Sequence, residues 1–128
     1  METLLRSALL DWLRADPALA ALNSITEEAP LSATAPWLGI AASASADWSV
    51  KDRKGREIRI ALELHCRGND PSAAGALARA VDARVDAMPR TQSGFEIASG
   101  LFLRARAERR ANNIRALLSE YRFRVLEA

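Results

Sequence analysis

A strict two-residue alternation in two neighbouring segments is the feature that most constrains how this chain can fold. From Leu38 to Val50 every even-numbered position is apolar, and the same alternation returns from Ile58 to Cys66. Successive side chains of a strand point to opposite faces, so this period predicts two strands that each have one buried and one exposed face. The charged, glycine-containing stretch 51–56 between them predicts the tip of a hairpin.

A second hairpin is predicted near the C-terminus. The inward positions of its first strand are expected to be Phe95, Ile97, Leu101 and Leu103. Phe102 interrupts this order and is expected on the exposed face. The turn is predicted near residues 109–113, where the pair Asn112–Asn113 suits turn geometry. In the last strand the inward positions are expected to be Leu117, Tyr121, Phe123 and Val125.

Apolar residues at three- and four-residue steps predict a helix at the N-terminus. They are Leu5, Ala8, Leu9, Trp12 and Leu13. The apolar surface is wider than one core contact needs, so this helix is either buried deeply in its own domain or also touches a neighbouring subunit. Asp16–Pro17 predicts a short further helix, and Asp70–Pro71 predicts a long one that runs to about Met88. Pro89 ends it, because proline removes a backbone donor.

These elements combine into one expected architecture. The order is helix, short helix, strand, strand, helix, strand, strand, and segment 23–36 is interpreted as a connector that can hold one short strand around Ile25. The predicted fold class is α+β in two layers, with a four-stranded antiparallel sheet made of two hairpins and the N-terminal and central helices packed on one face. A chain of 128 residues fits one domain, residues 1–128.

Composition excludes several classes of protein. The hydrophobic fraction is 49%, the charged fraction 27% and the net charge +2, a balance that excludes wholesale disorder. No apolar run is long enough for a transmembrane helix, so no membrane partner is expected. Arg6, Asp11 and Arg14 interrupt the apolar N-terminal stretch, unlike the core of a signal peptide. We therefore expect synthesis in the cytoplasm. The chain is rich in Ala and Arg and poor in Lys, which indicates a GC-rich bacterial genome.

Residues that usually carry chemistry are sparse. His65 and Cys66 are the only histidine and cysteine, and they fall short of the four ligands of a structural zinc site. Cys66 alternates onto the buried face, where a thiol is usually inert, and nothing near His65 indicates a catalytic triad. The six glycines form no phosphate-binding motif. The sequence therefore predicts no enzyme, and no catalytic, metal or cofactor site.

Basic and aromatic side chains are the remaining candidates. Lys51, Arg53, Lys54 and Arg56 lie at the first hairpin tip. The second hairpin holds Arg104, Arg106, Arg109 and Arg110, with Arg122 and Arg124 on the exposed face of the last strand. Arginine pairs with carboxylates and phosphates alike, so three interpretations stay open: a solvated face with cross-strand pairs to Glu96, Glu108 and Glu120, a protein interface, or a nucleic-acid interface. Trp37 and Phe102 are expected on the exposed face, and exposed aromatics favour a protein partner.

Three stretches, taken as an ordered set, resemble one known family. They are residues 15–22 after the first helix, residues 48–66 with the charged turn and the alternating strand, and the pair 103–107 and 121–125. This set is similar to the tail-completion, or tail-terminator, proteins of long-tailed phages and gene transfer agents, a group labelled DUF3168. The resemblance covers nearly the full chain.

The resemblance implies a structural virion protein that forms a homohexameric ring at the head-proximal end of the tail tube. Its implied partners are further copies of itself, the tail tube protein and the head–tail connector or stopper, and DNA only passes through the lumen. The chain is then expected in the bacterial cytoplasm during assembly and later in the tail of a virion or gene-transfer-agent particle. The alternative is a small nucleic-acid-binding α+β module. The predicted interface residues are Trp12, Trp37, Lys51, Arg53, Lys54, Arg56, Phe102, Arg104, Arg106, Arg122 and Arg124.

Overall fold

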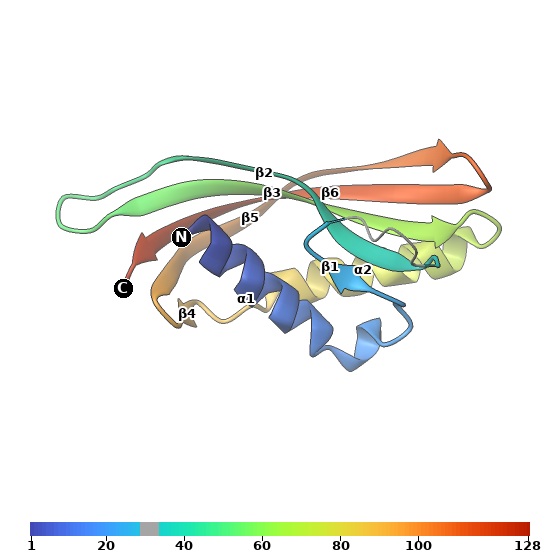
Figure 1. Ribbon diagram of the computed structural model, residues 1–128, viewed down its shortest axis with the longest axis horizontal. Helices are drawn as coiled ribbons and strands as arrows, with labels where there is room; N and C mark the ends of the chain where they lie inside the picture. Colours follow the sequence, from blue (N-terminus) through green and yellow to red (C-terminus); the bar gives the residue numbers. More distant parts are fainter. Residues whose placement is uncertain (29–33) are drawn as a thin grey trace.

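The computed structural model describes residues 1–28 and 34–128 (Figure 1). Its elements in chain order are α1 (Glu2–Arg14), the 3-10 helix η1 (Pro17–Leu19), β1 (Ile25–Thr26), β2 (Trp37–Asp47), β3 (Gly55–Arg67), α2 (Pro71–Asp86), β4 (Thr91–Gln92), β5 (Phe95–Arg110) and β6 (Ile114–Glu127). The predicted helices and the four long strands therefore occur in the expected order. Residues 29–33 of the predicted connector lie outside the described residues.

The sheet is larger than predicted, and the expected four-stranded antiparallel sheet is wrong. Six strands lie in the order β1-β2-β3-β6-β5-β4. The sheet is mixed, because β1 pairs with β2 in parallel while β4 pairs with β5 in the antiparallel sense. Each added strand has two residues, which is too short to leave an alternation in the sequence. The short strand expected around Ile25 is confirmed as β1.

Both long helices lie on the same face of the sheet and form the second layer (Figure 1). The layers meet in a core that includes Leu5, Leu9, Leu13, Ile58, Ile60, Leu62, Val81, Val85, Phe123 and Val125. Burying a side chain of this size stabilises the fold by about 1.5–3 kcal/mol relative to leaving it exposed. Among the described residues no helix covers the opposite side of the sheet, which we call the bare face.

The predicted helix caps and the predicted turn are present in the structure. The Asp16 and Asp70 carboxylates accept hydrogen bonds from the backbone amides of Ala18 at 3.0 Å and Ala73 at 3.1 Å, so both cap a helix. Asn112 and Asn113 have φ values of 62° and 58° at the β5–β6 turn. Asparagine tolerates this left-handed conformation better than most residues, so the predicted turn is confirmed.

A β-bulge in β2 reverses the faces that the alternation predicts. The pairing with β3 shifts between Ile40 and Ala42, so Ala42 lies opposite Ala61 and Ser43 lies opposite Ile60. An extra residue in one strand moves every later side chain to the other face. The even positions from Ala42 to Ala46 therefore point to the bare face and are exposed, and their predicted burial is wrong.

Two further bulges in β5 have the same effect. The pairing with β6 shifts between Ile97 and Ser99, and again between Phe102 and Arg104. Leu101 consequently lies opposite Arg122 on the bare face and is 48% exposed. Phe102 lies opposite Tyr121, on the side that carries the helices, and is 49% exposed. The predictions that Leu101 points inward and that Phe102 lies on the bare face are therefore both wrong.

Candidate functional site

Nucleophilic and metal-binding groups do not converge in the part of the chain that the structure describes. Cys66 is buried, and burial raises the pKa of its thiol, which disfavours the reactive thiolate. His65 stacks on the Trp37 ring with centroids 4.0 Å apart, and its Nε2 lies 2.8 Å from the Glu63 carboxylate. No group of three or more potential metal ligands occurs among the described residues. The candidate functional site is therefore a surface.

Opposite charges pair across the strands of the bare face. The Arg104 guanidinium donates two hydrogen bonds, of 3.1 and 3.0 Å, to the Glu120 carboxylate, and these bonds lower the pKa of Glu120. Glu57 lies between Arg124 at 3.1 Å and Arg122 at 3.8 Å. The exposed Arg104–Glu120 pair contributes little to stability, whereas Glu57, Arg122 and Arg124 are partly buried. These ion pairs fix the positions of the guanidinium groups on the surface.

A second group of charges continues this pattern toward the β5–β6 turn. Arg110 Nη1 lies 2.8 Å from the carboxylate of Glu63, and its Nη2 lies 3.0 Å from that of Glu108. Arg106 Nε lies 3.3 Å from Glu108. The expected cross-strand pair to Glu120 is therefore present, whereas Glu108 pairs with two arginines of its own strand, β5. Arginine remains in excess on the bare face, which carries Arg59, Arg67, Arg104, Arg106, Arg110, Arg122 and Arg124 against Glu57, Glu63, Glu96, Glu108 and Glu120.

The four basic residues predicted at the first hairpin tip divide into two pairs. Arg53 Nε donates to the Glu127 carbonyl at 2.9 Å, and Arg56 Nε lies 3.4 Å from the Glu2 carboxylate of α1. Both therefore tie the hairpin to the rest of the fold. Lys51 and Lys54 are exposed instead and project from the tip. The tip thus exposes two lysines.

The predicted interface aromatics occupy three different environments. Trp12 joins the two helices, because its Nε1 donates to the Arg84 carbonyl at 2.6 Å and its ring lies 3.3 Å from the Arg84 guanidinium carbon. Trp37 is 9% exposed, so its predicted exposure is wrong. Phe102 is exposed and meets Tyr121 edge to face, with centroids 5.8 Å apart. Of the three, only Phe102 offers half of its surface to a partner.

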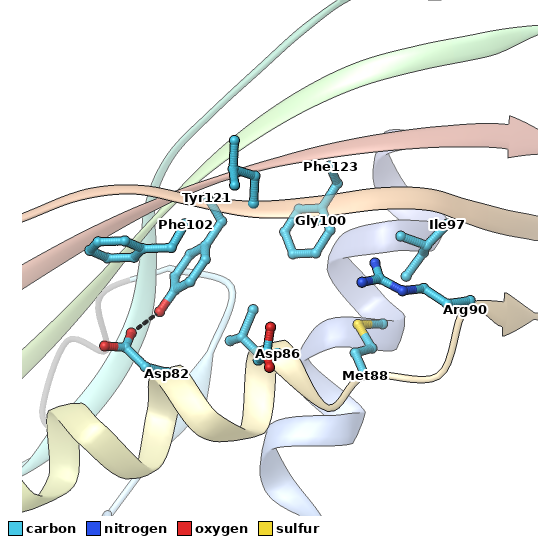
Figure 2. A pocket seen from close by; sticks show the side chains of 11 residues that line it. Asp82, Asp86, Met88, Arg90, Ile97, Gly100, Phe102, Tyr121 and Phe123 are labelled. Carbon is cyan, nitrogen blue, oxygen red and sulfur yellow. Dashed lines mark hydrogen bonds between the residues drawn. The ribbon is translucent and has the colours of Figure 1, made fainter.

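Sequence reasoning missed a pocket between α2 and the β5–β6 part of the sheet (Figure 2). Its volume is about 240 Å³, and its lining is mainly apolar. The lining residues are Asp82, Val85, Asp86, Met88, Arg90, Ile97, Gly100, Leu101, Phe102, Tyr121 and Phe123. The out-of-phase Phe102 was the signal for this pocket, because the bulge between Ile97 and Ser99 turns Phe102 to the helix side, where it borders the pocket.

One hydrogen bond holds the floor of this pocket. The Tyr121 hydroxyl donates to the Asp82 carboxylate of α2 (Figure 2). Burial of the ring, together with this carboxylate, raises the pKa of Tyr121. The tyrosine therefore stays neutral, and the contact joins β6 to α2 beneath the pocket.

The arrangement offers contacts rather than chemistry. It combines a bare face of paired charges, a lysine-bearing tip and an apolar pocket with acidic residues. In the described residues no helix has both the length and the apolar character needed to cross a membrane.

Comparisons with known proteins identify the family. A family model described as "Tail completion protein gp17" matches residues 7–126. A chain in the solved structure "Virion of native gene transfer agent (GTA) particle" is 26% identical, with a TM-score of 0.78 over 98% of this chain and 96% of that one. Another solved chain is 19% identical with a TM-score of 0.55, covers 100% of this chain and 96% of its own, and shows the fold alone.

No curated protein matches the chain. The family match nevertheless extends from within α1 nearly to the end of β6. The resemblance to tail-completion proteins and to gene transfer agents, predicted from the sequence, is confirmed. The chain belongs to the tail completion protein gp17 family, and it is a structural protein of a phage-type tail.

Proposed function

We propose that this chain is the tail terminator of a phage or gene-transfer-agent particle. Six copies form a ring that binds the last ring of the tail tube on one side and the head–tail connector on the other. DNA passes through the central hole. The observation that carries the proposal is the similarity over 98% of the chain, at a TM-score of 0.78, to a chain in a gene transfer agent virion.

The shape of the subunit supports contacts on two sides. The β2–β3 tip and the β5–β6 turn lie at opposite ends of the long axis (Figure 1). Both ends are basic, with Lys51 and Lys54 at the first and Arg109 beside the second, and all three are exposed. A ring built from such subunits can use one end between neighbouring copies and direct the other toward the tube or the connector.

The charge pairs of the bare face favour this function over the nucleic-acid-binding alternative. A face that grips DNA releases counterions as its arginines contact phosphates. Here Arg104, Arg110 and Arg124 already lie against carboxylates. Proteins that bind single-stranded nucleic acids stack several bases on aromatic side chains. Among the described residues, Phe102 is the only aromatic among the exposed large apolar side chains.

Native mass spectrometry of the purified chain, alone and with the tail tube protein of its particle, tests the proposal. We expect a hexamer in at least one of these conditions. A chain that stays monomeric in both contradicts the ring. Deletion of the gene is expected to give tails of uncontrolled length that do not join heads, and normal particles would contradict the termination function. A dimer that binds DNA with a steep dependence on salt would favour the nucleic-acid alternative.

A further inference from the structure

The pocket between α2 and β5 has an unusual rim. Its floor consists of buried side chains such as Met88, Ile97 and Phe123. Phe102 stands at the rim and is 49% exposed (Figure 2). Leu101 also borders the pocket, but it points to the bare face and is 48% exposed. Apolar side chains that border an apolar pocket at this exposure are typical of a surface that a partner covers.

Acidic residues of α2 line the same pocket. Asp82 and Asp86 lie one helical turn apart, and Asp86 is exposed (Figure 2). Asp82 accepts the Tyr121 hydrogen bond, whereas Asp86 forms no ion pair or side-chain hydrogen bond within the described residues. Arg90 is the single basic residue of the lining. The pocket therefore suits an occupant that has an apolar tip with positive charges beside it.

The β2–β3 hairpin tip has that chemistry. Val50 is 43% exposed, and Lys51 and Lys54 beside it are exposed as well. Among the described residues the exposed large apolar side chains are Leu4, Val50, Leu101 and Phe102. Two of these four border the pocket and one stands at the tip. A cavity of about 150 Å³ holds a benzene molecule, so a pocket of about 240 Å³ has room for a branched side chain and part of the tip.

Strand order places the tip and the pocket on different sides of the subunit. The β2–β3 pair lies toward one edge of the sheet and β5 lies toward the other, with β6 between β3 and β5. A contact between two different patches of identical copies is heterologous, and such contacts form a ring when the rotation between copies closes. We propose that the Val50 tip of one copy docks in the α2–β5 pocket of the next, with Lys51 and Lys54 beside Asp82 and Asp86. The inference rests on the proposed ring and names its subunit interface.

Disulfide cross-linking between copies tests this contact. In a Cys66→Ala background, which removes the natural thiol, the pair Val50→Cys and Asp86→Cys is expected to yield covalent ladders of up to six chains on mild oxidation. The matched control pairs Val50→Cys with Ala76→Cys, an exposed position of α2 outside the pocket, and is expected to yield no ladder. The oxidation is carried out at the concentration, or with the tube protein, at which native mass spectrometry detects the oligomer.

Charge exchange gives a second readout that does not depend on cysteine geometry. Lys51→Glu and Asp86→Lys are each expected to raise the concentration needed for half assembly by about tenfold. Because every copy contributes both patches, the two changes combined in one chain are expected to restore assembly. A hexamer that forms without the disulfide and ignores the charge changes overturns the inference and leaves the ring standing. A chain that never assembles, even with the tube protein, overturns both.

Discussion

β3 and β5 are long strands of one sheet that flank the same neighbour, β6, yet they use their apolar residues in opposite ways. β3 pairs with β6 from Gly55 to Arg67 without a register shift, whereas β5 pairs with two bulges. Ile60 of β3 is fully buried, while Leu101 and Phe102 of β5 are about half-exposed. An unbroken register delivers every second side chain to the core, and a bulged one turns apolar side chains toward a partner. Stability is therefore expected to depend mainly on β3, and association on β5.

The largest effect on stability is expected from truncation within β3. Ile60→Ala removes a side chain with 0% exposure, and we expect a loss of about 2–5 kcal/mol in the free energy of unfolding, measured by urea denaturation. The control is Arg59→Ala, one residue earlier on the bare face, which is expected to change that free energy by less than about 0.5 kcal/mol. Equal losses of unfolding free energy for the two variants would contradict the conclusion that the buried face of β3, and not its bare face, stabilises the fold.

The next largest effect on stability is expected from removal of the Tyr121 hydroxyl at the floor of the pocket. Tyr121→Phe leaves the Asp82 carboxylate without its hydroxyl donor, which is expected to cost about 1–2 kcal/mol in the free energy of unfolding. Because the pKa of Tyr121 is raised in the folded chain, the free energy of unfolding is expected to fall as the pH rises above about 10. The folded chain keeps the phenol proton above pH 10, whereas the unfolded chain loses it, so the stabilisation is complete below about pH 10 and declines above it.

The titration has a clean readout, because Tyr121 is the only tyrosine of the chain. Tyrosinate absorbance is expected to appear above pH 10 only together with unfolding, as followed by circular dichroism. The Tyr121→Phe variant is expected to lack the part of the alkaline destabilisation that this group contributes. Ionisation at pH 10 in a chain that remains folded would contradict the burial of the phenol.

The bulged strand should show the reverse profile. Leu101→Ser combined with Phe102→Ser is expected to change the free energy of unfolding by less than about 1 kcal/mol, because both side chains are about half-exposed. Hexamer formation in native mass spectrometry is expected to fail in the same variant. A stable hexamer formed by this variant would show that Leu101 and Phe102 are not part of the interface. It would also contradict the proposed difference between β3 and β5.

The sequence predicted the parts of the fold that follow from an uninterrupted period or a local cap. The alternation of β3 placed its apolar residues on the correct face, and the two aspartate–proline pairs began helices where expected. The bulges after Ile40, Ile97 and Phe102 could not be predicted, because an extra residue in one strand is defined only by its pairing with the next. The pairing of β1 with β2, and the whole of β4, escaped prediction because two residues carry no period.

The same limit applied to the candidate site. Basic residues at the first tip were identified correctly as a group, but only the fold separates Lys51 and Lys54, which project, from Arg53 and Arg56, which hold the hairpin. The burial of Trp37 also depends on tertiary contacts, here with His65 across the β2–β3 pair. The types of side chain in the sequence were enough to predict an interaction surface. Tertiary packing determines which of the predicted interface residues stay exposed.

The smallest effect on stability is expected from the arginines that follow the second bulge. The bulge places Arg104 opposite Glu120, and Arg106 follows it on the bare face. Both guanidinium groups are exposed, so Arg104→Glu with Arg106→Glu is expected to leave the free energy of unfolding almost unchanged, because exposed ion pairs contribute little.

Assembly should respond far more strongly to the same double variant. Reversing two charges turns the excess of arginine on the bare face into an excess of carboxylate, which opposes any partner that matched the original field. Electron microscopy of assembled tails is expected to show uncapped tubes. The control, Arg79→Glu on the exposed side of α2, is expected to cap normally. Normal capping by the double variant would restrict the interface to the tip and the pocket and would leave the charge pairs of the bare face with no function beyond solvation.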